Sequence, residues 1–377
     1  MRGDKETRGQ RDTGMEKVEQ VPQQVDVLVV GAGPGGSAAA RVAAEAGARV
    51  LLVEKRPTVG LPVQCAEYVP AQVVGHVSLP ERCIAQRIRA LRTHLPEGQV
   101  VETPSAGYVL DRALFDKGLA VAACRAGAEV WTATRALERT EGGILVRRGN
   151  QNSEIKCRII IGADGPHSTV GRWIGQTNAK FIEALQVEAI LPTPRDFTEV
   201  YFDPVYRGGY GWLFPKGETA NIGVGVNRGM GGDPRQALDH LLGHLKVERG
   251  MVVGRTGGPV PSGGPVARAH VGKVLLVGDA AGYTHPVTGA GIFSAIVSGT
   301  MAGQSVARAI QTGDLTALDE YEKEWAAFMG GPLRHALTKR QYLDKHWNDD
   351  PAILSDIIRE TWIAFKEYRR RKKQCKT

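Results

Sequence analysis

Three glycines and one carboxylate near the N-terminus have a spacing that could hold a phosphate-bearing ligand. Gly31, Gly33 and Gly36 follow an apolar run and precede a run of small residues, and Glu54 closes a second apolar run. In this pattern the first glycine allows a tight turn, the second lets the backbone approach a pyrophosphate, and the third lets a helix lie close on a strand. The helix that begins near Pro34 would turn its free N–H groups toward the phosphates. Because Glu54 could accept hydrogen bonds from a ribose, the segment predicts a strand, turn, helix and strand that bind a dinucleotide.

Two later segments also end an apolar run in glycine and aspartate. Residues 159–165 read Ile-Ile-Ile-Gly-Ala-Asp-Gly, and residues 277–282 read Val-Gly-Asp-Ala-Ala-Gly. A further glycine-rich turn, residues 289–291, precedes a run typical of a helix. Taken singly, each aspartate could be a turn or capping residue, because aspartate commonly bonds its neighbouring backbone in such places. The order of the motifs along the chain is more informative than either aspartate alone.

The three motifs together resemble those of the p-hydroxybenzoate-hydroxylase-like flavoproteins over residues 25 to 310. The resemblance implies FAD as the cofactor, with Asp279 bonded to the ribityl chain and Arg112 in contact with the cofactor. It also implies that N–H groups at residues 289–291 face the pyrimidine edge of the flavin and stabilise negative charge on the reduced ring. A nicotinamide nucleotide with its own domain is not expected, because the chain has no second strand-linked glycine motif of this kind. The predicted cofactor-binding residues are Gly31, Gly33, Pro34, Gly35, Gly36, Glu54, Lys55, Arg112, Asp164, Asp279, Gly289, Ala290, Gly291 and Ile292.

An aromatic block narrows the resemblance within this class. Residues 209–216 read Gly-Tyr-Gly-Trp-Leu-Phe-Pro-Lys, which resembles the P-x-x-Y-x-W-x-F-P signature of the geranylgeranyl reductase family. Enzymes of that family saturate isoprenoid double bonds, which implies a substrate site here. Alternate residues of a strand share one face, so the three aromatic side chains could wall an apolar tunnel or could pack the core of a sheet. The predicted substrate-binding residues are Tyr210, Trp212, Phe214 and Pro215.

Cys65 is the candidate proton donor. It lies in residues 60–68, which resemble the cysteine-bearing loop of the same family. Reduction of an unactivated alkene needs a hydride at one carbon and a proton at the other, and a thiol held above a flavin could supply the proton directly or by ordering water. A lone cysteine can equally be a small space-filling residue. Arg207 stands where the family motif begins with proline, and Tyr68 stands where a glycine often follows the cysteine, so the cavity mouth and the position of the thiol stay open.

These motifs require an α/β fold in which the nucleotide-binding unit is interrupted. Buried-strand composition returns after a middle block of strands and Gly/Pro turns. The chain therefore predicts a discontinuous Rossmann-like FAD-binding domain with an inserted antiparallel-sheet (α+β) domain and a C-terminal helical segment. The expected boundaries are 1–21 for a disordered tail, 22–175 and 265–312 for the FAD-binding domain, 176–264 for the substrate-binding sheet domain, and 313–377 for the helical segment with its basic end.

Composition bounds the class of protein. The 377 residues carry a net charge of +8, and 42% hydrophobic residues with 47 glycines suit a globular α/β protein. No apolar run reaches the length of about 18 residues that a spanning helix needs. The five cysteines form no C-x-x-C pair. This pattern argues against structural zinc, a cysteine-held iron–sulfur cluster and a disulfide framework, so we expect no metal site and a reducing compartment.

Much of the positive charge lies in residues 369–373, after apolar residues that recur at helical spacing between positions 353 and 365. This pattern predicts an amphipathic helix with a basic end, which could rest on anionic lipid or could dock on the body of the protein. Nucleic acid is not an expected partner, because no aromatic residues interleave with a long basic groove. We therefore expect a cytoplasmic protein, either free or peripheral on the inner membrane face.

The leading functional prediction is an FAD-dependent reductase that saturates geranylgeranyl-type double bonds by hydride transfer from N5 of the reduced flavin, in a cavity that excludes water. Its expected partners are a prenyl lipid or prenyl diphosphate as substrate and NADPH or ferredoxin as external electron donor. An aromatic hydroxylase or related monooxygenase would share the fold and the three FAD motifs, and only the aromatic block and the Cys65 loop argue against it. A non-catalytic, membrane-associated flavoprotein that relays electrons is the third alternative.

Overall fold

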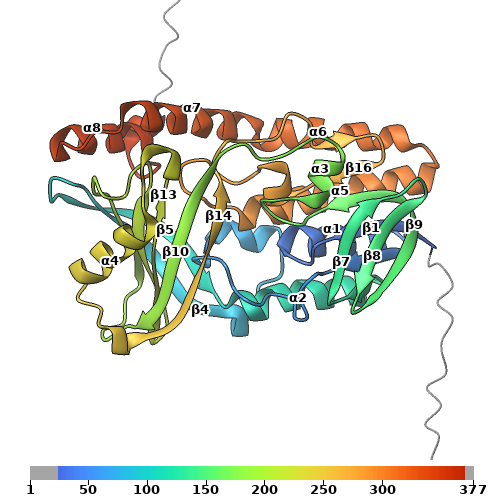
Figure 1. Ribbon diagram of the computed structural model, residues 1–377, viewed down its shortest axis with the longest axis horizontal. Coiled ribbons are helices and arrows are strands. Elements are labelled where there is room, and N and C mark those ends of the chain that lie inside the picture. The colour runs from blue at the N-terminus through green and yellow to red at the C-terminus, as the bar shows by residue number, and fades with distance from the viewer. Residues whose placement is uncertain (1–23, 370–377) are drawn as a thin grey trace, which may run out of the picture.

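The computed structural model describes residues 24–369, in which two eight-stranded sheets stand at opposite ends of the molecule (Figure 1). The first sheet has the strand order β15 (His270–Val271), β16 (Val274–Leu276), β9 (Gln151–Gly162), β1 (Gln24–Val30), β2 (Val50–Val53) and β6 (Glu129–Trp131). From β16 to β6 all its pairs are parallel. An antiparallel hairpin extends it beside β9, formed by β7 (Thr134–Arg139) and β8 (Gly143–Arg148).

Strand β1 and the glycine turn after it lead into a helix that packs on a distant helix. The run from Val27 to Val30 is buried, as is typical of a parallel strand covered on both faces. Helix α1 (Pro34–Glu45) then packs against α5 (Ile292–Thr312), far along the chain. A Cβ at Gly299 of α5 would lie 2.1 Å from the carbonyl oxygen of Gly35, so glycine at this crossing lets the two helices meet at their backbones.

The second sheet is antiparallel except for one pair. Its strand order is β14 (Val252–Pro261), β10 (Phe181–Ile190), β13 (Thr219–Val226), β12 (Tyr210–Lys216), β11 (Phe197–Tyr201), β4 (Ile84–His94), β5 (Val100–Leu110) and β3 (Tyr68–Pro70). Strands β11 and β4 are the parallel pair. Helix α4 (Pro234–His244) covers one face of this sheet and buries Leu213, Ile222 and Leu241. Residues 84–110, which fall within the range expected for the FAD-binding domain, thus contribute two strands to the second sheet.

The C-terminal part is helical, as the sequence predicts. Helices α6 (Glu320–Trp325), α7 (Gly331–His346) and α8 (Pro351–Thr361) run along one long edge of the molecule and extend from the first sheet to the second (Figure 1). Leu354 and Ile358 of α8 are fully buried, and Trp362 is 3% exposed. The sequence left two alternatives for this amphipathic helix, contact with anionic lipid or docking on the body of the protein. The described part of the helix is docked on the body. The expected tail, 1–21, and most of the basic end lie outside the described residues.

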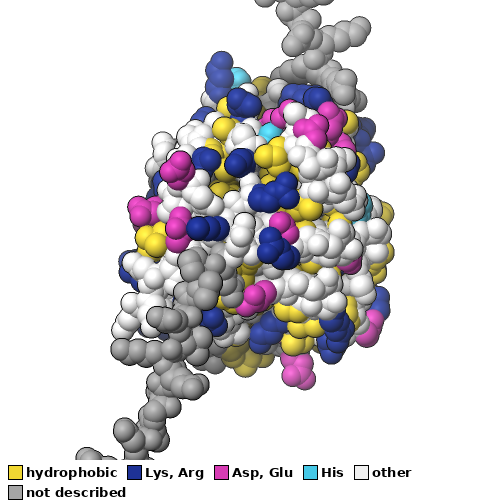
Figure 2. Space-filling model, turned by 90° about the vertical axis from the view of Figure 1, so that its right-hand side faces the viewer, with side chains coloured by type: hydrophobic (Ala, Val, Ile, Leu, Met, Phe, Trp, Pro, Cys, Tyr) yellow, Lys and Arg dark blue, Asp and Glu magenta, His cyan; other side chains and the backbone are white. Residues whose placement is uncertain are grey.

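The architecture confirms the predicted α/β class with an antiparallel second sheet and a helical C-terminal segment. The predicted helix after Asp111 is α2 (Arg112–Arg125), and a short α3 (Thr169–Trp173) follows β9. Within residues 24–369, no helix combines the length and apolar character needed to cross a bilayer. Figure 2 shows the end of the molecule formed by the first sheet, where basic and acidic side chains are interspersed and hydrophobic ones form small separate spots.

Candidate active site

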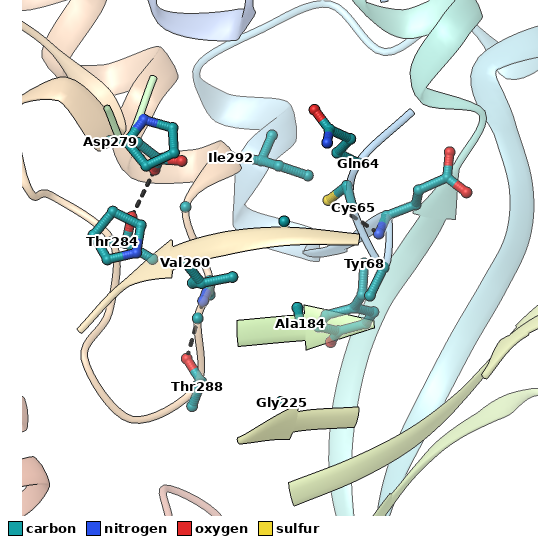
Figure 3. Close-up of a pocket in the computed structure, with 18 of the residues that line it drawn as sticks. Gln64, Cys65, Tyr68, Ala184, Gly225, Val260, Asp279, Thr284, Thr288 and Ile292 are labelled. Atoms are coloured by element: carbon teal, nitrogen blue, oxygen red, sulfur yellow. Dashed lines mark hydrogen bonds between the residues drawn. The ribbon is translucent and has the colours of Figure 1, made fainter. Parts of the chain in front are cut away.

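A cavity of about 520 Å³ lies between the two sheets and is lined by residues of both. On one side it meets the loops that follow the carboxyl ends of β1, β9 and β16, the edge at which parallel sheets bind their ligands. On the other side it meets β10, β12 and β14 of the second sheet. Figure 3 shows Ala184 of β10 and Val260 of β14 on this side. The volume is within the range of cofactor and small-molecule sites.

The glycine turn after β1 forms one wall of this cavity. Gly31 has φ +102°, a backbone conformation that favours glycine. A Cβ at Gly36 would lie 1.9 Å from the carbonyl oxygen of Gly31, so only glycine allows this contact between helix and strand. A Cβ at Gly33 would meet no described atom within 4 Å, and Gly33 lines the cavity at the N-terminus of α1. The turn therefore leaves open the space that a pyrophosphate would occupy beside the helix N-terminus.

Glu54 braces the same turn from the end of β2. One carboxylate oxygen accepts the N–H of Ala32 at 3.0 Å, and the other accepts the N–H of Arg56 at 2.9 Å. The carboxylate also lines the cavity. Since each oxygen can accept more than one hydrogen bond, Glu54 keeps capacity for a ribose hydroxyl.

Asp279 lies just after β16 and lines the cavity. Its carboxylate accepts the hydroxyl of Thr284 at 2.6 Å (Figure 3). Burial raises the pKa of Asp279, and the hydrogen bond from Thr284 and the charge of Arg112 partly oppose this rise. A ligand hydroxyl that donates to this carboxylate would stabilise its charged form, which fits a polyol such as a ribityl chain. Gly291 lies next to this carboxylate, because a Cβ at Gly291 would be 3.0 Å from a carboxylate oxygen of Asp279.

Arg112 begins α2 and reaches the cavity with its guanidinium held in place. Its Nε and Nη2 donate to the two carboxylate oxygens of Asp116 at 2.7 and 2.8 Å. Burial lowers the pKa of Arg112, but the Asp116 carboxylate and other nearby groups raise it overall, so the guanidinium stays charged. A fixed positive charge thus lines the cavity and acts on the Cys65 thiol.

The thiol of Cys65 faces the interior of the cavity. Figure 3 shows its sulfur turned toward Ile292, the first residue of α5. The N–H of Glu67 donates to Sγ at 3.2 Å, and the amide of Gln186 donates to the Cys65 carbonyl oxygen at 3.1 Å. Burial raises the pKa of the Cys65 thiol, opposed mainly by the charge of Arg112. The thiol is therefore protonated at neutral pH, as a proton donor must be.

The three predicted aromatic residues form a continuous wall on β12. The Tyr210 and Trp212 rings lie 5.9 Å apart, and Phe214 contacts Tyr68 of the cysteine loop at 6.0 Å between ring centroids. The Tyr210 hydroxyl donates to the carbonyl oxygen of Thr288 at 2.6 Å, which joins this wall to the loop before α5. All three line the cavity. Trp212 also belongs to a hydrophobic core cluster against which Tyr210 and Phe214 pack, so both alternatives describe the position of this block.

Glu67 joins the cysteine loop to the second sheet through contacts that sequence reasoning missed. It is 1% exposed and has φ +72°, an uncommon conformation for a residue with a side chain. Its carboxylate accepts the backbone N–H of Arg112 at 2.9 Å and the amide of Asn221 at 2.8 Å, and it pairs with the Lys216 ammonium at 2.7 Å. Burial lowers the pKa of Lys216, but the hydrogen bond and charge of Glu67 raise it above its ordinary value.

Gln186 extends this network to the aromatic wall. Its amide nitrogen donates to Asn221 at 3.0 Å, and its amide oxygen accepts the indole N–H of Trp212 at 2.9 Å. One chain of hydrogen bonds therefore links Trp212, Gln186, Asn221 and Glu67 beneath the Cys65 loop. The signal in the sequence is clear only for Asn221, which interrupts an apolar run in β13, because Gln186 shares β10 with Glu183 and Glu188.

The structure brings most of the predicted residues to one cavity and places the others outside it. Asp164 accepts hydrogen bonds from the Ser168 hydroxyl at 2.5 Å and the Thr169 N–H at 2.6 Å, so it stabilises the start of α3. Arg207 pairs with Asp349 at 2.9 Å on the surface. The predicted residues that line the cavity are Gly33, Pro34, Gly35, Glu54, Cys65, Arg112, Tyr210, Trp212, Phe214, Asp279, Gly289, Ala290, Gly291 and Ile292. Those outside its lining are Gly31 and Gly36 within the turn, the exposed Lys55, Asp164, and the buried Pro215.

Comparison with known proteins agrees with this arrangement. Residues 24–205 and 265–334 match the family model described as FAD binding domain, and residues 183–258 match the model described as geranylgeranyl reductase catalytic domain. The chain is 39% identical over 367 residues to the digeranylgeranylglycerophospholipid reductase of Methanothrix thermoacetophila, with 91% of this chain and 94% of the relative covered. It is 38% identical over 371 residues to the enzyme of the same name from Methanosarcina acetivorans, with 91% and 90% covered.

A solved structure leads to the same family. The crystal structure of a geranylgeranyl bacteriochlorophyll reductase-like protein from Thermoplasma acidophilum superposes with a TM-score of 0.80 at 30% identity, covering 91% of this chain and 97% of that chain. The predicted cofactor, FAD, and the predicted enzyme class are confirmed by these matches. Because the FAD binding domain spans more than half of the chain and the relatives align over almost their whole length, this chain belongs to the geranylgeranyl reductase family of FAD-dependent oxidoreductases.

Proposed function

We propose that this chain saturates the carbon–carbon double bonds of geranylgeranyl chains carried by a glycerophospholipid, with FAD as the redox cofactor. The substrate class is suggested by the relatives named digeranylgeranylglycerophospholipid reductase, which align with most of the chain. The observation that carries the proposal is that the Cys65 thiol, the aromatic wall and the cofactor turn all line one cavity. A prenyl chain in this cavity would lie against the aromatic side chains, within reach of both a thiol and a flavin.

The residues of the chain have separate tasks in this reaction. Gly33, Glu54, Asp279 and the loop 289–291 would hold FAD, which supplies a hydride from N5 when bound and reduced. Cys65 holds the proton on Sγ, because burial raises the pKa of this thiol. Cys65 would transfer its Sγ proton to one alkene carbon, while the other carbon would receive the hydride that bound, reduced flavin supplies, so that one double bond is consumed. The resulting thiolate takes its next proton from solvent.

Two neighbours of Cys65 partly offset the cost that burial adds to forming its thiolate. The N–H of Glu67 donates to Sγ, and the nearby charge of Arg112 lowers the free energy of the thiolate. The aromatic wall excludes water, which limits the loss of reducing equivalents to side reactions. Tyr210 joins the wall to the loop before α5, so that the prenyl chain and the flavin edge would be held together.

An anaerobic single-turnover assay tests this proposal. The FAD-loaded protein is reduced without oxygen and mixed with a geranylgeranylated glycerophospholipid, and flavin reoxidation is followed with the product mass. We expect reoxidation with a gain of two hydrogens per bond. For Cys65→Ala we expect normal FAD content and a rate at least about 100-fold lower, since general acid catalysis contributes about 10²–10⁴-fold.

The matched control is Cys83→Ala, which removes a second buried thiol that does not line the cavity. Its rate should stay within about 2-fold of the wild type. Reoxidation only after oxygen is admitted, with an oxygenated product, would instead identify a monooxygenase. Full flavin loading without turnover of any prenyl compound would identify an electron-relay protein. A Cys65→Ala rate equal to that of the wild type would assign the proton to another donor.

We further propose that an external donor, NADPH or ferredoxin, reduces the flavin, and that the protein meets its lipid at a membrane surface. Ile363 supports the second point, because it is 41% exposed and also lines the cavity, so the cavity reaches the surface beside an apolar side chain. Ile353 of α8, ten residues before Ile363, is a second exposed apolar side chain, at 49% exposure. The assay above tests both points when it is run with each donor separately and with the lipid in vesicles.

A further inference from the structure

Arg340 brings a buried positive charge to the part of the cavity that lies between β12 and the C-terminal helices. This residue of α7 is 2% exposed and lines the cavity. Its Nη2 donates to the carboxylate of Asp344, one helical turn later. Its Nε is buried and has no acceptor among the described residues. Buried polar groups almost always have a partner, so an unpaired guanidinium N–H at a cavity wall points to a ligand that supplies the acceptor.

Trp362 provides a second unpaired donor in the same region. It is 3% exposed, lines the cavity, and its indole Nε1 has no acceptor within the described part of the chain. Its ring packs against Tyr210 at 5.0 Å and Phe202 at 5.1 Å, so the indole is held in one position. Two N–H donors, one of them cationic, thus remain without acceptors in the described part of the chain, and both residues line the cavity.

Two arginines of this region each pair with an aspartate, but only Arg340 lines the cavity. Arg207, which stands at the first position of the aromatic motif, is paired with Asp349 and does not line the cavity. Gly208 beside it has φ +68°, and a Cβ at this position would lie 3.0 Å from Nη2 of Arg340. Glycine therefore leaves room for the Arg340 guanidinium at the start of β12. The positive charge in this part of the cavity therefore comes from Arg340 of α7 and not from Arg207 of the aromatic motif.

The position suits a substrate that is polar at one end and apolar along its length. Phe214 lies beside Tyr68 of the cysteine loop, and Tyr210 lies beside Trp362. These two residues of β12 are four positions apart, about 13 Å along an extended strand. A prenyl chain of four isoprene units is long enough to cover this wall, with its head group at Arg340 and its double bonds toward Cys65.

We propose that Arg340 and Trp362 bind a phosphate oxyanion on the head group of the substrate and so set the position of the prenyl chain along the aromatic wall. The inference rests on the proposed function, because it assigns the head-group end of the same substrate. Guanidinium groups bind phosphate oxygens through charge-assisted hydrogen bonds, which are stronger than neutral ones. Asp344 holds one end of the guanidinium and leaves Nε for the ligand.

Ligand binding to the oxidised holoenzyme tests the proposal without turnover. Geranylgeranyl phosphate and geranylgeraniol differ only in the head group, and their Kd values follow from the change in flavin absorbance. For Arg340→Gln we expect the Kd for the phosphate to rise about 10- to 100-fold and that for the alcohol to change less than about 2-fold. Arg340→Lys should restore part of the loss, since it keeps the charge without the planar guanidinium.

Trp362→Phe keeps a smaller aromatic side chain at this position and removes the indole N–H, so it keeps the test usable if Arg340→Gln does not fold. We expect this variant to bind the phosphate about 3- to 10-fold more weakly and the alcohol unchanged. Equal losses for both ligands, or no loss in any variant, would overturn the inference and leave the reductase function intact. Inorganic phosphate that competes as strongly as the prenyl phosphate would also overturn it, by assigning the site to the free ion. Head-group binding through Arg340 without double-bond reduction would contradict only the proposed function.

Discussion

The two sides of the cavity are built in different ways. The cofactor side is backbone from short consecutive stretches, chiefly the turn 31–36, where a Cβ at Gly36 would lie 1.9 Å from a carbonyl oxygen. The substrate side is made of side chains that meet from distant parts of the chain. Gln186 donates to the carbonyl of Cys65, 121 residues away, and Asn221 donates to Glu67, 154 residues away.

This difference predicts different sensitivities. A turn made of backbone in close contact should tolerate no added atom where the fold leaves no room for one, and its packing should depend little on charge. A side made of buried polar side chains should accept changes of shape more readily than the loss of one partner, because an unpaired buried group is costly. Three substitutions can break or sharpen this comparison.

The largest effect is expected for Gly36→Ala. The new methyl group would meet the Gly31 carbonyl oxygen, which cannot move without opening the turn, so we expect the free energy of unfolding to fall by more than about 3 kcal/mol or the chain not to fold. The matched control is Gly33→Ala, whose Cβ meets no described atom within 4 Å. This control should unfold within about 1 kcal/mol of the wild type but bind FAD at least about 10-fold more weakly, because the methyl group occupies the path of the pyrophosphate. Urea unfolding of the apoprotein and flavin content measure the two effects, and normal stability of Gly36→Ala would contradict the tight backbone contact.

A smaller effect is expected for Glu67→Gln on the substrate side. The change keeps the shape of the side chain but removes the charge that pairs with Lys216 and accepts two N–H groups. We expect a loss of about 2–4 kcal/mol in unfolding free energy and slower alkene reduction, with FAD still bound. The control is Glu188→Gln, since Glu188 lies 3.8 Å from Lys216 and its side chain is 34% exposed. The free energy of unfolding of that variant should change by less than about 1 kcal/mol. Equal losses in the two variants would show that burial does not determine how much an ion pair with Lys216 stabilises the fold.

The same contrast explains how much could be predicted from the sequence. Apolar runs encode the strands of the first sheet, and glycines at fixed spacing encode the glycine turn and the loop before α5. The positions of these segments and the identity of the cofactor could therefore be predicted from short motifs. Alternation along β12 likewise predicted that Tyr210, Trp212 and Phe214 share a face, and they line the cavity together.

The residues that were missed or displaced depend on tertiary contacts. The Gly-Ala-Asp-Gly motif did not reveal whether Asp164 faces the cavity or stabilises α3, since both suit an aspartate after a strand. Nothing local to Glu67 identifies Asn221 or Lys216 as its partners. Arg340 lies in a helix of the C-terminal segment, about 130 residues after the aromatic motif that it accompanies. Contacts across such separations follow from the packing of the two sheets rather than from spacing.

The smallest effect concerns His285, which lies on the cofactor side but is held by side-chain contacts. The N–H of Thr288 donates to Nδ1 at 3.2 Å, so the ring carries its hydrogen on Nε2, 3.2 Å from the Tyr368 hydroxyl. Burial lowers the pKa of His285 from 6.5 to about 4. Since the folded pKa lies below the unfolded value, the unfolded chain takes up the proton first as the pH falls. The contribution of this residue to stability is therefore complete above pH 6.5 and is lost between pH 6.5 and about 4.

His285→Gln should remove this pH dependence. Between pH 6.5 and pH 5 the group accounts for up to about 2 kcal/mol of unfolding free energy, so the urea midpoint of the variant should fall less on acidification than that of the wild type. The control is His240→Gln, since the His240 side chain is 47% exposed beside Asp203 and should leave the wild-type pH dependence in place. If only His285→Gln loses the pH dependence, the loop before α5 depends on a neutral imidazole. In that case only the glycine turn of the cofactor side is held by backbone contacts alone. If all three proteins show the same pH dependence, the imidazole does not hold this loop. Backbone contacts would then hold the loop as they hold the glycine turn.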